Sequence, residues 1–171
     1  MTETHETYQT HIISATVSNR PGVLARVAGL FSSRGYNIDS LAVGETEDPE
    51  LSRMTIAVHG DESVLEQIRK QLRKLVDTVK VQDFAGRDFV QRDLMLIKVS
   101  ASPAKRGEIF QLCEVFEGKV VDISPKHVML EITGPEIKID AFINVVRPYG
   151  IREVARTGRI AMLRGAKDQA R

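Results

Sequence analysis

Two asparagines and a glycine flank the first helix expected in this chain. Asn19 and Gly22 lie just before it, in the segment Asn-Arg-Pro-Gly, and Asn37 follows it. A helix N-terminus leaves backbone N–H groups unpaired and carries a partial positive charge, so it attracts a carboxylate. Asparagine oxygens accept hydrogen bonds from an ammonium group, and Gly22 has no Cβ to block a ligand. The set therefore suits a small zwitterion such as an amino acid.

The elements expected around these residues bring them together. An alternating strand over residues 11–18 precedes a helix that opens at Pro21, where the missing N–H is harmless. Gly35 ends that helix, and the next strand follows at once, so we expect Asn37 to approach Asn19 and Gly22. Apolar neighbours are expected to meet the side chain of a ligand: Val23, Leu24 and Ile38.

A simpler interpretation of the same residues stays open. Asn and Gly are common in turns and at helix starts without any ligand. The three apolar neighbours can equally be core residues, and a residue at an interface between chains can serve both purposes.

The order of elements indicates an α+β fold. Strand and helix patterns follow one another as β-α-β-β-α-β, the ferredoxin-like arrangement, and the same order then repeats. We therefore predict two ferredoxin-like βαββαβ units in tandem, over residues 8–85 and 90–164. Each is within the normal size of a domain.

The second strand of the first unit, residues 37–44, predicts an oligomer. Simple alternation places Ile38 and Ala42 on one of its faces and Leu41 and Val43 on the other. In this topology the strand lies at a sheet edge, and no Lys or Pro protects it from pairing. We expect a homodimer in which two copies pair across this edge and bring two sets of Asn19, Gly22 and Asn37 to the interface.

Composition excludes several other classes of function. The net charge is +1 and Trp is absent, which argues against nucleic acid. No apolar run is long enough to span a membrane. Cys113 is the only cysteine, so no internal disulfide is possible and a cytoplasmic location is expected. The four histidines have unrelated spacings, which predicts no metal site, and no catalytic acid, base or nucleophile pair is evident.

Several segments resemble a known family. Residues 11–27 are similar to the effector loop of ACT domains. The following segment, Gly-Leu-Phe-Ser-Ser-Arg-Gly-Tyr-Asn-Ile at 29–38, and Leu-Ser-Arg-Met-Thr-Ile at 51–56 are similar to the small regulatory subunit of acetolactate synthase (acetohydroxyacid synthase). Residues 92–99 and 154–158 extend the resemblance over nearly the whole chain.

The resemblance implies a non-catalytic regulatory subunit. The catalytic subunit of such an enzyme is a separate, larger chain that binds thiamine diphosphate, Mg²⁺ and FAD, so no cofactor is expected in this chain. That chain joins pyruvate to pyruvate or 2-oxobutyrate, the first common step towards valine, leucine and isoleucine. The small subunit raises this activity and makes it sensitive to L-valine, and its C-terminal domain helps to contact the catalytic chain. The effector positions of the family carry over to Asn19, Gly22 and Asn37, with Val23, Leu24 and Ile38 as neighbours.

Three alternatives remain open from the sequence. A free-standing ACT-domain amino-acid sensor that controls another enzyme or a transcription factor would share the ligand site and differ only in its partner. An RNA-binding ferredoxin-like protein would need aromatic residues on its central strands, where Ile13 and Ile56 stand instead. An enzyme on the same frame would need a reactive pair that we cannot assemble.

Overall fold

The computed structural model describes residues 9–165 and divides the chain into two units. The N-terminal unit contains the described residues up to Val90 and those from Ala161 onward, and the C-terminal unit contains Gln91–Ile160. Residue 8, the predicted start of the first domain, lies outside the described residues.

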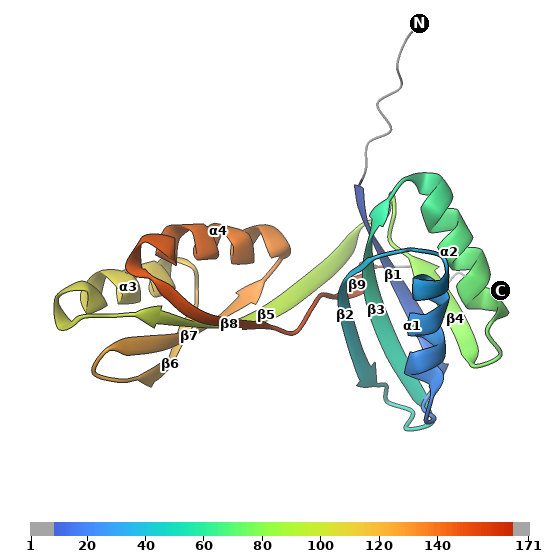
Figure 1. The fold of residues 1–171 in the computed structure, drawn as a ribbon, viewed down its shortest axis with the longest axis horizontal. Coiled ribbons are helices and arrows are strands. Elements are labelled where there is room, and N and C mark those ends of the chain that lie inside the picture. Colours follow the sequence, from blue (N-terminus) through green and yellow to red (C-terminus); the bar gives the residue numbers. More distant parts are fainter. Residues whose placement is uncertain (1–8, 166–171) are drawn as a thin grey trace, which may run out of the picture. The chain divides into compact units, whose positions relative to one another are not determined.

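The N-terminal unit is a four-stranded antiparallel sheet with two helices on one face (Figure 1). The strands have the order β2-β3-β1-β4, so β2 is at an edge as predicted. Alternation along β1 and β3 places one set of side chains under the helices, which explains why Ile13, Ile56 and Val58 are fully buried. The elements in chain order are β1 (Gln9–Ser18), α1 (Val23–Ser33), β2 (Ile38–Glu45), β3 (Leu51–Gly60), α2 (Glu62–Lys74) and β4 (Thr78–Asp83).

The C-terminal unit repeats this arrangement, with the strand order β6-β7-β5-β8. Its core lies between one sheet face and helices α3 and α4, where Ile97, Leu130 and Phe142 are buried. The two units confirm the predicted α+β, ferredoxin-like class. The elements are β5 (Phe89–Ser100), α3 (Pro103–Val115), β6 (Lys119–Ile123), β7 (His127–Gly134), α4 (Glu136–Val146), a short 3₁₀ helix (Arg147–Tyr149) and β8 (Ile151–Arg156).

The first helix begins two residues later than the sequence predicts. Gly22 has φ 84° and ψ −10°, and Val23 N donates a hydrogen bond of 3.4 Å to Arg20 O. These values describe a type II turn, with Pro21 and then Gly22 at its central positions. The prediction that the helix opens at Pro21 is therefore wrong. The turn must be completed before Val23 can start the helix.

A β-bulge near the start of β2 changes which side chains face the core. Ile38 is opposite Val58 and Ser40 is opposite Ala57, so Asp39 is an extra residue in the ladder. The extra residue reverses the alternation, and Ile38 and Leu41 both pack against the core of the N-terminal unit. The prediction that these two residues face opposite sides is therefore wrong.

A final strand, β9 (Ile160–Leu163), returns to the N-terminal unit and pairs with β5. Ala161 packs with Ile12 and Phe84, and Phe89 and Leu163 pack against them. These apolar contacts cover part of the sheet face opposite α1 and α2. The predicted domain 90–164 thus takes in both the C-terminal unit and a strand that belongs to the N-terminal unit.

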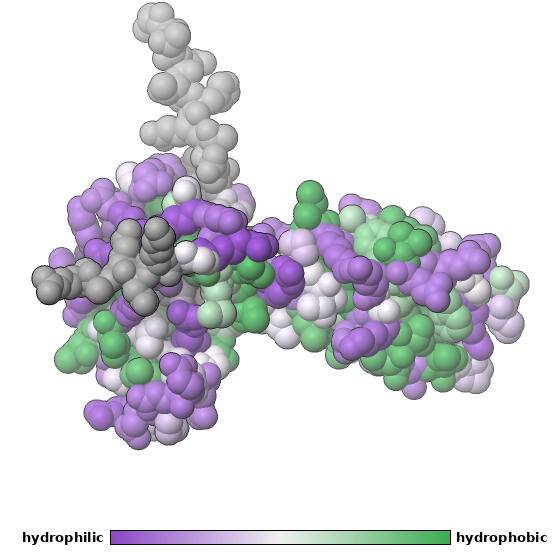
Figure 2. All heavy atoms as spheres, turned by 180° about the vertical axis from the view of Figure 1, so that it is seen from behind, coloured by the Kyte–Doolittle hydropathy of each residue, from purple (hydrophilic) through white to green (hydrophobic). Residues whose placement is uncertain are grey.

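The edge strand β6 exposes apolar side chains. All five of its residues are exposed, and Val120, Val121 and Ile123 keep 39%, 46% and 54% of their surface in solvent. Figure 2 shows hydrophobic residues gathered at the surface of this unit. An exposed edge of this kind readily accepts another protein surface.

Candidate functional site

Asn19, directly after β1, is held by two hydrogen bonds through the same side-chain nitrogen. Its Nδ2 donates to Glu45 Oε1 at 3.1 Å and to the backbone oxygen of Pro49 at 2.9 Å. Both N–H groups of the amide are therefore used within the chain. Oδ1 remains as an acceptor at the exposed end of the sheet.

The N-terminus of α1 lies three residues beyond Asn19 and has no side-chain cap. Val23 N is used in the turn, so the open N–H groups are those of Leu24 and Ala25, and the helix dipole favours an anion there. By contrast, α2 is capped by Asp61, whose Oδ1 accepts from Val64 N at 2.8 Å. Hydrogen bonds from Ser63 and from Val64 N lower the pKa of Asp61.

Gly22 gives a ligand room to approach the helix start. A Cβ at this position would lie 3.2 Å from Nη1 of Arg26, and the positive φ angle strains any residue with a side chain. Arg26 itself is occupied, because it pairs with Asp77 at 2.7 Å. Its side chain therefore stays beside Gly22.

Asn37 lies at the other end of β2, beside the bulge. Its Nδ2 donates to Asp39 Oδ1 at 3.1 Å, and Asp39 Oδ2 is 3.0 Å from Nδ1 of His59. That ring nitrogen is also 3.2 Å from Thr10 Oγ1. Asn37 is thus held by a polar chain that reaches β3 and β1.

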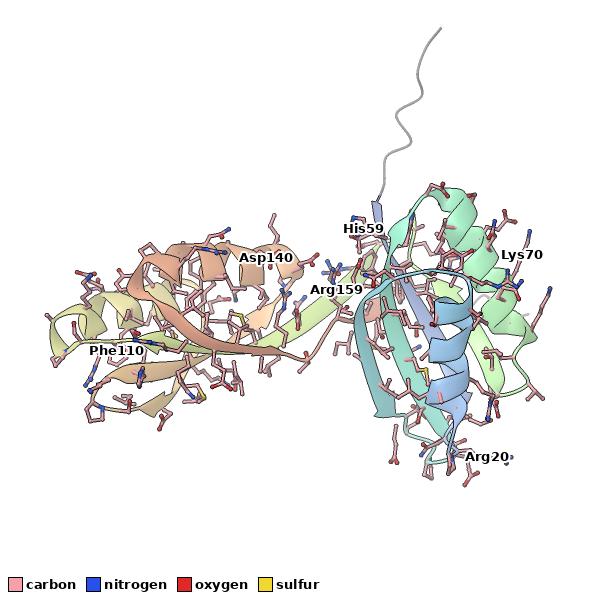
Figure 3. The ribbon with its side chains drawn as sticks, in the orientation of Figure 1. Arg20, His59, Lys70, Phe110, Asp140 and Arg159 are labelled. Carbon is pink, nitrogen blue, oxygen red and sulfur yellow. The ribbon has the colours of Figure 1, made fainter. Side chains whose placement is uncertain are left out.

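Within one chain, Asn37 and Asn19 are far apart. Strand pairing places Ile38 beside Val58, whereas Glu45, at the other end of β2, is beside Ser52 and next to Asn19. β2 is eight residues long and rises roughly 3.3 Å per residue, so its ends are about 20–25 Å apart. Figure 3 shows Arg20 and His59, which neighbour the two asparagines, at opposite ends of the unit. The expectation that Asn37 approaches Asn19 from the next strand is therefore wrong for a single chain.

The three predicted apolar neighbours have different environments. Val23 is only 3% exposed and belongs to the core. Leu24, one position further along the helix, is 45% exposed. Ile38 is partly buried against the core and lies beside Asn37. Only Leu24 and Ile38 therefore present surface that a ligand can touch.

The C-terminal unit contains a buried ion pair that sequence spacing does not reveal. Asp93 is 2% exposed and accepts from Nε and Nη2 of Arg156 at 2.8 and 2.5 Å, and from Thr157 Oγ1 at 3.2 Å. Burial opposes the charge on Arg156, but its hydrogen bonds with Asp93 prevail and raise the pKa of the guanidinium. Asp140, on α4, contacts the same guanidinium at 3.2 Å. The pair anchors β8 to β5.

Other candidate chemistry has a structural explanation. Cys113 is 2% exposed, and burial raises the pKa of its thiol, which makes it unreactive. Among residues 9–165, no group of three His, Cys, Asp or Glu side chains could hold a metal ion. No helix in this described part of the chain has the length and apolar character needed to cross a bilayer.

The comparisons with known proteins agree with this geometry. Residues 13–80 match the family model described as an AHAS small subunit-like ACT domain, which fits the strand order and the uncapped helix. The N-terminal unit is therefore an ACT domain. Residues 92–165 match the model described as the small subunit of acetolactate synthase. The chain belongs to the family of acetolactate synthase small subunits.

Individual relatives support this assignment along their whole length. A protein of Archaeoglobus fulgidus with the name "Probable acetolactate synthase small subunit" is 54% identical over 92% of this chain and 98% of its own. The acetolactate synthase small subunit of Bacillus subtilis is 47% identical over 93% of each chain. The crystal structure of the small subunit from Thermotoga maritima superposes with a TM-score of 0.84 at 46% identity, over 91% of this chain and 98% of its own.

Proposed function

We propose that this chain regulates acetolactate synthase: it activates the larger catalytic subunit and makes it sensitive to feedback inhibition by L-valine. The observation that carries the proposal is the pair of asparagine amides whose nitrogens are used within the chain. Their oxygens are left for an ammonium group. Family membership supports acetolactate synthase as the enzyme concerned.

A second copy of the chain can close the gap between the two asparagines. β2 is an edge strand, and antiparallel pairing over its full length would oppose Ile38 of one copy to Glu45 of the other. Asn37 of one copy would then lie near Asn19 of its partner. A two-fold axis repeats the arrangement, so a homodimer has two such sites.

Valine fits the chemistry of this interface between two copies. Its carboxylate would meet the open N–H groups at the start of α1 beside Gly22, and its ammonium would meet the oxygens of Asn19 and the partner's Asn37. Its isopropyl group would contact Leu24 and the partner's Ile38. Val23 would support this surface from the core.

Inhibition follows from linkage between valine binding and the packing of the two copies. A ligand shared between two chains favours the arrangement that it fits best and so increases its population. A coupling of about 1–3 kcal/mol is enough for regulation. The coupling is reciprocal. If the catalytic subunit prefers another arrangement, it weakens valine binding by the same factor by which valine weakens the binding of that subunit.

The proposal assigns all chemistry to the partner subunit. Thiamine diphosphate, Mg²⁺ and FAD would be bound by that larger chain, in the cytoplasm, with no nucleic acid or membrane involved. The test is the turnover of the catalytic subunit with and without this chain across a valine titration. We expect higher activity with the chain and inhibition only in its presence. Equal activity in the two series would refute the proposal.

Substitution of Asn37 by Ala tests the ligand contact. The side chain is exposed and makes its hydrogen bond only locally, to Asp39. We expect valine affinity to fall roughly 10- to 100-fold, because a hydrogen bond to a charged group is lost. Titration calorimetry measures the affinity. The thermal unfolding temperature should stay unchanged, and a large fall in it would mean that Asn37 is structural.

Substitution of Val121 by Lys tests the role of the C-terminal unit. We propose that the exposed apolar edge of β6 contacts the catalytic subunit, so a charge there should lower activation several-fold. Ile137→Lys is the matched control, because Ile137 is 79% exposed on helix α4 of the same unit and is not part of β6. Activation assays measure both variants. Dissociation of the small subunit into monomers by Val121→Lys would instead assign this edge to contact between copies.

A further inference from the structure

The acidic residues at the two ends of β2 hold the asparagine amides in one orientation. Asp39 accepts from Asn37 Nδ2, and Glu45 accepts from Asn19 Nδ2. A carboxylate offers only acceptors, so each amide must turn an N–H towards it and its oxygen away. Neither amide can flip without setting oxygen against oxygen.

Further contacts support both asparagine–carboxylate pairs. Asp39 uses its second oxygen for His59, at 3.0 Å. Glu45 ends β2 opposite Ser52, and the amide that it contacts is also fixed by Pro49 O at 2.9 Å. The orientation of both amides is therefore determined by the fold around them, before any ligand binds.

We propose that Asp39 and Glu45 are positioning residues that make the site selective for an α-amino acid over the 2-oxo acid of the same carbon skeleton. This inference rests on the proposed function. In the dimer, Glu45 of one copy and Asp39 of the other flank the same site. They orient two amide oxygens towards the ligand and add two negative charges near its ammonium.

A 2-oxo acid meets the opposite situation. It has no ammonium, and its keto oxygen is another acceptor, so it would face the oxygens of Asn19 and Asn37 without a hydrogen atom between them. A site built to accept from a ligand N–H strongly rejects an analogue that lacks it. The carboxylate and the apolar side chain are common to both molecules, so only this part of the site can separate them.

The experiment titrates the full chain with L-valine and with 3-methyl-2-oxobutanoate by calorimetry. The natural chain should bind valine at least roughly 100-fold more tightly than the oxo acid. In Asp39→Asn the new side chain can donate as well as accept, so Asn37 is free to flip. In Glu45→Gln the Asn19 amide stays fixed by Pro49 O, and the site loses one negative charge near the ammonium. Valine affinity should then fall roughly tenfold in each variant, and that of the oxo acid should stay or rise.

A nearby substitution provides the control. Glu47→Gln removes the same charge from the turn after β2, where Glu47 is exposed and makes no side-chain hydrogen bond within the described residues. It should leave the affinity ratio unchanged. A ratio that stays constant in both Asp39→Asn and Glu45→Gln, or equal binding of the two ligands to the natural chain, overturns this inference while valine binding stands. No valine binding by the natural chain overturns the proposed function itself.

Discussion

Substitution of Gly22 by Asp is expected to abolish valine inhibition while the catalytic subunit is still activated. The new carboxylate would face the carboxylate of valine at the start of α1. Two like charges about 4 Å apart repel by roughly 4 kcal/mol at an effective dielectric constant of ~20, which is a loss of affinity of a hundredfold or more. Inhibition curves of the reconstituted enzyme and calorimetry of the isolated chain measure this loss.

The variant Gly22→Asn separates charge from backbone strain. Asn has the same shape as Asp, and both must adopt the positive φ angle of 84°, at a similar cost of about 1 kcal/mol. Asn carries no charge, so it does not repel the carboxylate of the ligand. Gly22→Asn should therefore retain more valine affinity than Gly22→Asp. Equal affinities in the two variants, or an unchanged affinity in Gly22→Asp, would contradict a carboxylate site at this turn.

Substitution of Asp93 by Asn is expected to destabilise the C-terminal unit by about 2–4 kcal/mol, because a buried charge pair loses one partner. The Asn amide would also set N–H donors against the guanidinium of Arg156. Part of the penalty is relieved, since the Arg156 side chain is 31% exposed and keeps its contact with Asp140. The unfolding temperature of this unit should fall by roughly 10–25 °C.

Hydrogen exchange locates this effect within the chain. Amides of β5 and β8 should exchange faster in Asp93→Asn, and those of β1 and β3 should not change. Asp140→Asn is the control. It removes a partner of the same guanidinium at a site that is 53% exposed, and it should cost less than about 1 kcal/mol. Equal losses for the two variants would contradict a special role for the buried carboxylate.

The sequence predicts the architecture because its evidence is local. Alternating apolar residues predict β1, and Gly35, at φ 70°, ends α1 as predicted. These signals repeat in the second half of the chain. The spacing of apolar residues and the order of strands and helices are therefore enough to predict two tandem ferredoxin-like units.

The errors arise where one residue changes the geometry of those after it. Pro21 is compatible with both a helix start and a turn. Because Gly22 adopts a left-handed conformation, the segment forms a type II turn. The bulge at Asp39 leaves no mark in the spacing of apolar residues, yet it reverses the faces of β2. The return of β9 to the N-terminal unit depends on packing around Phe84, which is distant in sequence.

The sequence predicts which residues form the candidate site and what kind of ligand they suit, but it does not predict how they are arranged in space. Asn19, Gly22 and Asn37 are recognisable as residues that suit an amino acid. Their separation within one chain follows from the pairing of β2 with β3, and only the register shows it. The orienting carboxylates and the pair of Asp93 with Arg156, 63 residues apart, depend on contacts that sequence spacing does not reveal.

The most direct test of a ligand site shared between two copies is complementation of two defective chains. Gly22→Asp and Asn37→Ala each weaken both sites of a homodimer, but a dimer with one chain of each kind keeps one site of full affinity, with Gly22 from one chain and Asn37 from the other. Coexpression in equal amounts should restore about a quarter of the natural number of valine sites, measured by calorimetry. If each site were built from a single chain, the mixture would bind no more valine than the separate variants, and that result would contradict a shared site.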